Sequence, residues 1–170
     1  MKSFLKKTIW ISLICFYFFQ IEIVRAIVPY YYFPTIKNLQ KQSLYIGKNA
    51  YQLLYFGQYE DSLNLAKLAV KINAKDEKLW LILAEAQIAN KKYKNALNSL
   101  NKAEQINSNI SEIYFAKSNV YLKTSQQTKA KNALEKGIKI EPNNHKAIFQ
   151  LGNIFLMEKI YSGAIKLFDK

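Results

Sequence analysis

This 170-residue chain has few of the residues that build catalytic and metal-binding sites. Cys15 is its only cysteine and His145 its only histidine, which excludes an intrachain disulfide and a thiolate metal cluster and leaves no catalytic dyad or zinc site to assemble. The five glycines are scattered and form no phosphate-binding loop. Two carboxylate pairs, Glu60-Asp61 and Asp76-Glu77, fall at turns and expected helix starts, where negative charge is favourable. We therefore expect no enzymatic activity, cofactor, metal or small-molecule substrate.

Acidic residues are also scarce, because 12 Asp and Glu stand against 25 Lys and Arg, for a net charge of +13. Such an excess can indicate nucleic-acid binding. However, Arg25 is the only arginine, and arginine is the usual reader of base edges. The lysines are spread over expected helix faces, in a composition typical of an AT-biased genome. We interpret the charge as a solvated basic surface without specific nucleic-acid contact.

What the chain does contain is a 34-residue repeat, whose four units begin at Ser43, Glu77, Ser111 and His145 without any insertion. Large apolar residues recur at positions 4 and 24 of the unit. Small residues recur at positions 8, 20 and 27, where two helices must touch. The small residues are Ala50, Ala84, Ser118 and Gly152 at position 8, Ser62, Ala96, Ala130 and Ala164 at position 20, and Ala69, Ala103 and Gly137 at position 27.

Each unit is predicted to be a pair of antiparallel helices. Apolar residues follow a helical period, as Leu79, Leu83 and Ala86 do, and turn-forming clusters at 56–58, 90–92 and 124–126 interrupt it. Stop signals separate the units at 73–76, 107–109 and 141–144, and Pro142 makes the last of these the clearest. One helix pair cannot bury its own apolar face, so the units must stack.

The repeat length and the small residues at positions 8, 20 and 27 resemble the tetratricopeptide repeat (TPR) family. The resemblance implies an all-α fold, namely a TPR helix-turn-helix solenoid preceded by an N-terminal hydrophobic helix. Its TPR domain would span residues 43–170, with repeats at 43–76, 77–110, 111–144 and 145–170. It also implies protein–protein binding. The RNA-binding pentatricopeptide repeat has a similar period, but the small residues at positions 8 and 20 favour TPR.

In TPR proteins the first helix of each unit lines a groove, chiefly through positions 2, 5, 9, 12 and 13. Some TPR domains capture a chaperone's C-terminal carboxylates with Lys at position 5 and Asn at position 9, but here Asn119 is accompanied by Phe115, so that clamp is predicted to be missing. An apolar or amphipathic peptide fits better, with Phe115 and Phe149 as anchors and Asn119 and Asn153 holding backbone groups. The alternative is that some of these side chains only pack between units. The predicted partner-binding groove comprises Tyr51, Leu54, Leu81, Glu85, Ile88, Phe115, Asn119, Leu122, Phe149, Asn153 and Leu156.

Residues 1–28 are predicted to be a membrane anchor or a signal segment. Three lysines precede an apolar run from Ile9 to Phe19 that only Ser12 interrupts, and the stretch continues to Val28. About 20 residues suffice to span roughly 30 Å of hydrocarbon. Small residues at Val24 and Ala26 also suit a signal peptidase, so both interpretations stay open.

Residues 29–42 are predicted to form a linker rich in aromatic residues and proline. Tyr30, Tyr31 and Tyr32 lie between Pro29 and Pro34, which do not fit inside a helix. Tyrosine prefers the lipid headgroup region, so the cluster either holds the repeat domain close to a bilayer or packs onto the first repeat.

The order of these parts resembles a small TPR family encoded in plastid and cyanobacterial genomes. The resemblance lies in a short hydrophobic N-terminus, then residues 27–32 (IVPYYY), then residues 44–51 (LYIGKNAY) leading into about three TPR units. Members are implicated in photosystem I assembly or stability. This implies a plastid (chloroplast) protein at the thylakoid membrane, with stromal repeats that bind photosystem I subunits or assembly factors. A general TPR adaptor in bacterial envelope biogenesis or secretion is the alternative.

Overall fold

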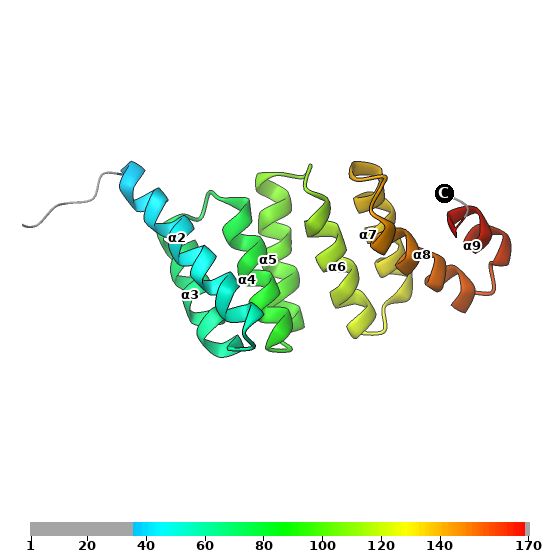
Figure 1. Cartoon of the computed structure of the whole chain (residues 1–170), viewed down its shortest axis with the longest axis horizontal. Coiled ribbons are helices and arrows are strands. Elements are labelled where there is room, and N and C mark those ends of the chain that lie inside the picture. The colour runs from blue at the N-terminus through cyan, green and yellow to red at the C-terminus, as the bar shows by residue number, and fades with distance from the viewer. Residues whose placement is uncertain (1–35, 169–170) are drawn as a thin grey trace, which may run out of the picture. The chain divides into compact units, whose positions relative to one another are not determined.

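The computed structural model describes residues 36–168, and this part of the chain consists of eight α-helices without a strand (Figure 1). Residues 1–35, with the predicted anchor or signal and the first half of the predicted linker, lie outside the described residues. None of the helices α2 to α9 combines the length and hydrophobicity that a membrane crossing needs. The helices are α2 (Ile36–Tyr55), α3 (Tyr59–Ile72), α4 (Glu77–Ala89), α5 (Tyr93–Ile106), α6 (Ser111–Lys123), α7 (Gln127–Ile140), α8 (His145–Met157) and α9 (Tyr161–Phe168).

The helices pair into four hairpins that follow one another along the stack (Figure 1). Three of them begin where the repeat predicts, because α4, α6 and α8 begin at Glu77, Ser111 and His145. The first differs, since α2 begins at Ile36, seven residues before the expected start at Ser43 and inside the predicted linker. No proline lies between Pro34 and Ser43. Because no proline interrupts these residues, helix α2 can extend back beyond Ser43 toward Pro34.

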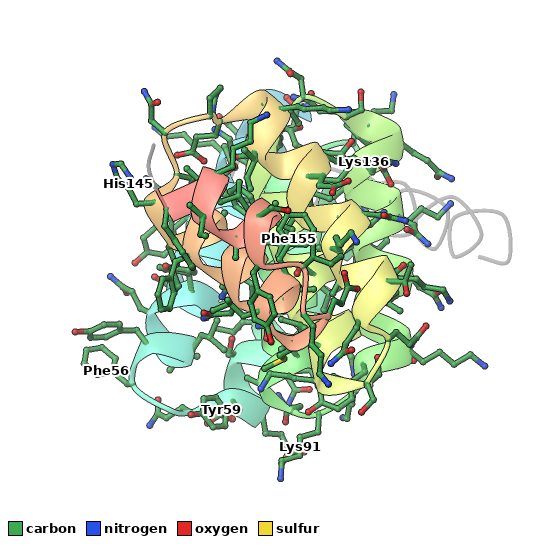
Figure 2. The ribbon with its side chains drawn as sticks, turned by 90° about the vertical axis from the view of Figure 1, so that its right-hand side faces the viewer. Phe56, Tyr59, Lys91, Lys136, His145 and Phe155 are labelled. Atoms are coloured by element: carbon green, nitrogen blue, oxygen red, sulfur yellow. The ribbon has the colours of Figure 1, made fainter. Side chains whose placement is uncertain are left out.

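One turn geometry closes all four hairpins. The residues at 57, 91, 125 and 159 have positive φ, and only the first of them is glycine. The amide that follows each one donates to the carbonyl five residues earlier, as Gln58 does to Leu53 at 2.9 Å and Lys92 does to Gln87 at 2.8 Å. This is the 6→1 bond of a Schellman motif, which satisfies carbonyls at a helix end. At the first turn Phe56 points away from the ribbon (Figure 2).

The prediction that small residues mark the helix contacts is confirmed, since all eleven are buried. At two sites the contact depends on glycine. A Cβ on Gly137 would lie 2.3 Å from the Phe115 ring, and a Cβ on Gly152 would lie 2.4 Å from the Phe168 ring. The core therefore runs along the stack as three successive clusters, centred on Leu63 and Leu79, on Leu100 and Ile113, and on Leu134 and Leu151.

Side chains at the starts of α4 and α8 bond to the loops that precede these helices or cap their first turns. The Asp76 carboxylate caps α4 by accepting from the amide of Lys78 at 2.9 Å, and the Asn144 side chain caps α8 by accepting from Ala147 at 3.0 Å. At position 4, Trp80 Nε1 donates to the Ala74 carbonyl at 2.8 Å. These bonds satisfy amides at the starts of α4 and α8 and hold the Ala74 loop against α4.

Candidate functional site

The first helices of all four hairpins contribute to one groove of about 660 Å³. Its apolar part includes Leu54 from α2, Ile88 from α4 and Phe115 from α6. Its polar part includes carboxylates, amides and one amine. The lining residues are Leu54, Tyr59, Glu85, Ile88, Ala89, Glu112, Phe115, Ala116, Asn119, Asn144, Lys146, Ala147 and Gln150.

Five of the predicted groove residues line this cavity: Leu54, Glu85, Ile88, Phe115 and Asn119. They come from α2, α4 and α6, at positions 5, 9 and 12 of their units. Phe115 is half-buried because one ring edge packs on Gly137, yet it still faces the cavity. The stacking of three hairpins therefore brings these side chains together.

Six other predicted groove residues do not line the cavity. Leu81 is partly buried against the second core cluster. Phe149 is 59 % exposed and its ring lies 5.9 Å from that of Phe168, so it packs within the last hairpin. Asn153 is half-buried, and the remaining three, Tyr51, Leu122 and Leu156, are exposed away from the cavity.

Eight lining residues were not predicted. Glu112 and Lys146 both occupy position 2 of their units, a position expected to face the groove, so the repeat register contained this signal. Ala116 and Gln150 share position 6, which was not among the positions expected to face the groove. Asn144 precedes its helix as a cap, and Tyr59 begins α3 at the rim, where its carbonyl accepts from Asn90 Nδ2 at 2.7 Å.

Two carboxylates give the groove a local acidic character. Burial raises the pKa of Glu85 above its ordinary value, and the negative charge of Glu112 raises it further. No hydrogen bond or ion pair to Glu85 is formed within the described residues. Glu112 is exposed, and its carboxylate lies 3.1 Å from the Ser111 hydroxyl. Lys146 is the single cation of the lining and pairs with neither carboxylate.

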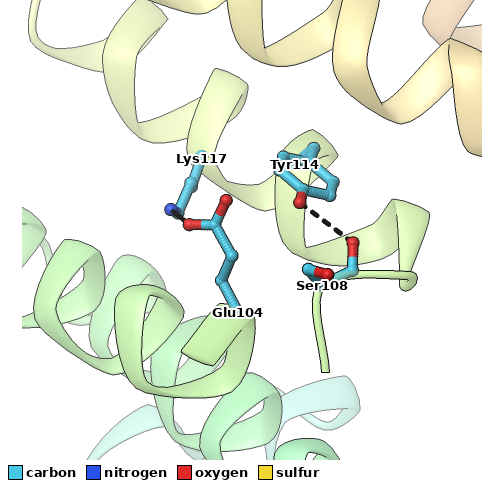
Figure 3. A network of polar contacts seen from close by, with 4 residues as sticks. All are labelled: Glu104, Ser108, Tyr114 and Lys117. Carbon is cyan, nitrogen blue, oxygen red and sulfur yellow. Dashed lines mark hydrogen bonds and ion pairs between the residues drawn. The ribbon is translucent and has the colours of Figure 1, made fainter. Parts of the chain in front are cut away.

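A second polar cluster lies between α5, α6 and α7, outside the groove (Figure 3). Glu104 forms an ion pair with Lys117, and the Tyr114 hydroxyl donates to the Ser108 carbonyl at 2.9 Å. Burial alone would raise the pKa of Glu104, but the hydrogen bond and charge of Lys117 prevail and lower it. Burial and the Glu104 charge raise the pKa of Tyr114. This cluster satisfies its own charges.

Exposed residues at the ends of the hairpins complete the polar surface. His145, at position 1 of the last unit, is exposed, as the sequence indicated. Figure 2 places it at the opposite end of the hairpins from Lys91. Lys136 Nζ lies 5.9 Å from the centre of the Tyr114 ring and Lys131 Nζ lies 5.0 Å from that of Phe155, so part of the basic charge covers aromatic faces.

The two central hairpins match a known repeat family. Residues 77–110 and 111–144 each match the tetratricopeptide repeat model. These two units are tetratricopeptide repeats. Their bounds are those predicted from the sequence, and the described helices form an all-α TPR solenoid, which confirms that part of the fold prediction. The predicted N-terminal hydrophobic helix lies outside the described residues.

Solved structures share this TPR fold at low sequence identity. A crystal structure of MamA is 22 % identical, with a TM-score of 0.68 over 87 % of this chain and 80 % of that chain. The first TPR of Spaghetti (RPAP3), bound to the HSP90 peptide SRMEEVD, is 19 % identical, with a TM-score of 0.67 over 71 % of this chain and 95 % of that chain.

A third solved structure of the same fold is the type III secretion translocator chaperone SycD of Yersinia enterocolitica. It is 16 % identical, with a TM-score of 0.66 over 69 % of this chain and 95 % of that chain. No curated protein sequence matches this chain. These likenesses establish the architecture of the repeats and nothing finer.

Proposed function

We propose that this chain is a membrane-associated TPR scaffold that binds polypeptide segments of partner proteins. The observation that carries the proposal is the groove of about 660 Å³ to which all four hairpins contribute. A groove of this kind suits an extended or helical peptide, because apolar anchors give affinity and amide groups hold the backbone. TPR proteins are generally scaffolds, so we propose a binding role and not a catalytic one.

We propose an apolar segment, and not an acidic C-terminus, as the ligand. The RPAP3 domain was solved with the acidic peptide SRMEEVD. In this chain the residue at position 5 of the third unit is Phe115, and two carboxylates, Glu85 and Glu112, line the groove. Like charges brought together across a desolvated surface are unfavourable.

We further propose that the partners are photosystem I subunits or assembly factors at the thylakoid membrane of a plastid, with the repeats in the stroma. The support is the resemblance in residues 27–32 and 44–51 together with the hydrophobic N-terminus. In this role the protein would bind an unassembled subunit reversibly and release it when its assembled neighbours bury the same apolar segment.

Co-purification from thylakoids tests this proposal. The full-length chain is expected to retain photosystem I subunits, and Tyr59→Ala is expected to weaken that retention because Tyr59 lines the groove and is 47 % exposed. Tyr161→Ala is the matched control, since Tyr161 occupies the same position of the last unit, is 60 % exposed and lies outside the groove. Normal photosystem I assembly in a deletion strain would contradict the proposal.

A TPR adaptor in bacterial envelope biogenesis or secretion is the second candidate. It is favoured by the small residues Val24 and Ala26, which suit signal peptidase cleavage. N-terminal sequencing of the protein from its native membrane separates the two. An intact N-terminus supports the membrane-anchored scaffold, whereas a mature chain that begins at Ile27, found in the periplasm, supports the adaptor.

A further inference from the structure

Glu85 is an unpaired carboxylate in the groove lining. It is half-buried on α4, and no described side chain donates to it or forms an ion pair with it. Glu112, from the next hairpin, lies close enough for its charge to disfavour the ionised form of Glu85. A half-buried charge without a partner reduces stability, and such groups occur preferentially at functional sites.

Two other shielded glutamates of the chain have lysine partners. Glu104 is paired with Lys117, and Glu158 with Lys131 at 2.9 Å, with carboxylate side chains that are 29 % and 24 % exposed. Almost all of the 25 basic residues are lysine, so a partner for Glu85 would be easy to supply. Glu77 and Glu135 are also half-buried without an ion pair within the described residues, so Glu85 is distinguished by its place in the groove lining together with a second carboxylate, Glu112.

The surroundings of the two carboxylates define a ligand with three kinds of group. Leu54, Ile88 and Phe115 provide an apolar surface. The side chains of Asn119 and Gln150 also line the groove and make no hydrogen bond within the described residues, so they are available to backbone amides and carbonyls. Apolar side chains, a peptide backbone and one cation occur together in a polypeptide segment.

We propose that the groove selects a polypeptide segment that carries a lysine or arginine among apolar side chains, with the cation seated between Glu85 and Glu112. The inference rests on the proposed function, because it names the chemistry of the segment that the scaffold binds. Lys146 lies in the same lining, so a second cation close to α8 is disfavoured and the preference is for a single, correctly placed positive charge.

This preference is opposite to the one that the whole chain would produce. A net charge of +13 attracts acidic peptides at long range. At physiological ionic strength, however, charges more than about 8 Å apart are largely screened, and contact with the local carboxylates decides the affinity. A preference for a cationic peptide therefore cannot arise from net charge.

Three short amphipathic peptides that differ only at one central position, as lysine, methionine or glutamate, test the proposal. Their affinities for the purified full-length protein in detergent are measured by fluorescence anisotropy, with empty micelles as the blank. The lysine peptide is expected to bind about tenfold more tightly than the methionine peptide. The glutamate peptide is expected to bind most weakly.

The variants assign this preference to the groove. Glu85→Gln combined with Glu112→Gln is expected to abolish the difference between the lysine and methionine peptides. Glu135→Gln removes one charge from a half-buried position on α7, outside the groove, and is expected to retain the difference. Micelle binding is common to all variants and cancels in the comparison.

Each other outcome overturns the inference in a recognisable way. If the three peptides bind equally and Tyr59→Ala still weakens their binding, the scaffold function stands but cation selection is refuted. Tightest binding of the glutamate peptide would show that net charge decides. If no peptide binds and light scattering shows a dimer, a second copy occupies the groove, and both the inference and the proposed binding mode fail.

Discussion

Glu85 and Glu104 are both shielded from solvent in the same stack of helices, but their surroundings shift their pKa values in opposite directions. Burial, followed by the charge of Glu112, raises the pKa of Glu85. Burial also acts on Glu104, but the hydrogen bond and charge of Lys117 outweigh it and lower the pKa. The comparison distinguishes a charge that the fold satisfies from one that it leaves for a ligand.

The repeat register explains why Glu104 needs its partner. Glu104 and Lys117 occupy position 28 of one unit and position 7 of the next. At the preceding interface the same two positions hold Val70 and Leu83, which pack in one apolar cluster. The following interface has Ile138 and Leu151 there, again in one cluster. The ion pair therefore replaces an apolar contact between hairpins.

The largest effect is expected from removing one member of this pair. Lys117→Met should lower the free energy of unfolding by about 2 kcal/mol, because it leaves a shielded carboxylate without its counter-charge. We estimate less than for a fully buried pair because the Glu104 side chain is 29 % exposed. Urea unfolding of the full-length chain measures the change.

The matched control is the double variant Glu104→Val with Lys117→Leu, which copies the Val70–Leu83 contact. It should recover wild-type stability or exceed it, since replacing both charges by packed apolar groups is often neutral or stabilising. A double variant as unstable as Lys117→Met would show that the charges themselves are needed, and the structural account of Glu104 would fail.

The same contrast between paired and unpaired groups occurs in two buried hydroxyls. Ser62 Oγ donates to the Ala50 carbonyl at 2.7 Å, whereas Ser118 Oγ has no partner within the described residues. Ser62→Ala should cost about 1 kcal/mol, and Ser118→Ala should gain up to about 1 kcal/mol. Equal losses of stability in thermal unfolding of the two variants would contradict the assignment of Ser118 as unpaired.

Glu85→Gln is expected to have a smaller effect than Lys117→Met, and of the opposite sign. Because it removes an unpaired, half-buried charge, stability at neutral pH should stay the same or rise by up to about 1 kcal/mol. Chemical unfolding of the variant beside wild type measures this. A loss of more than about 1 kcal/mol would mean that the folded chain itself uses the Glu85 charge.

The smallest expected effect is the pH dependence of the stability difference between Glu85→Gln and wild type. The raised pKa of Glu85 contributes stability that is fully present below the ordinary glutamate pKa of about 4.3 and is lost as pH rises through the folded-state pKa. Wild type and Glu85→Gln should therefore converge in stability on acidification.

Glu104→Gln provides the opposite case. The lowered pKa of Glu104 contributes stability that is present above the ordinary value and is lost as pH falls through the folded-state pKa. This variant should be less stable than wild type at neutral pH and should also converge with it in acid. Thermal unfolding between pH 7 and 4 would contradict the account if both variants differed from wild type with the same sign.

Most of the fold could be predicted because its determinants recur at one spacing. Positions such as those of Ala84 and Ala96 must hold a small residue in every unit, because two helices touch there. The spacing of these residues was therefore enough to predict the hairpins and their register. The start of α2 at Ile36 was missed because repeat comparison has nothing to compare before the first unit. Proline is excluded from a helix interior but not from the region where a helix begins, so Pro34 is compatible with a helix that starts at Ile36.

The candidate site was predicted less completely, because a groove depends on how hairpins stack. Phe115 lines the cavity, but Phe149, at the same position of its unit, packs beside Phe168 instead. Glu112 occupied a position expected to face the groove, yet its interaction with Glu85 crosses from one hairpin to the next. Periodicity reports that a position is repeated, and it does not report which charges meet there.

The pKa of Glu85 itself tests the central claim most directly. Carboxyl carbon NMR titration of the full-length chain, labelled at glutamate, can follow Glu85 and Glu104 with and without the lysine peptide. We predict that the pKa of Glu85 is above the ordinary value in the free protein and falls when the peptide binds, while that of Glu104 stays low in both states. A Glu85 pKa that is not raised in the free protein, or that the peptide leaves unchanged, would contradict the account.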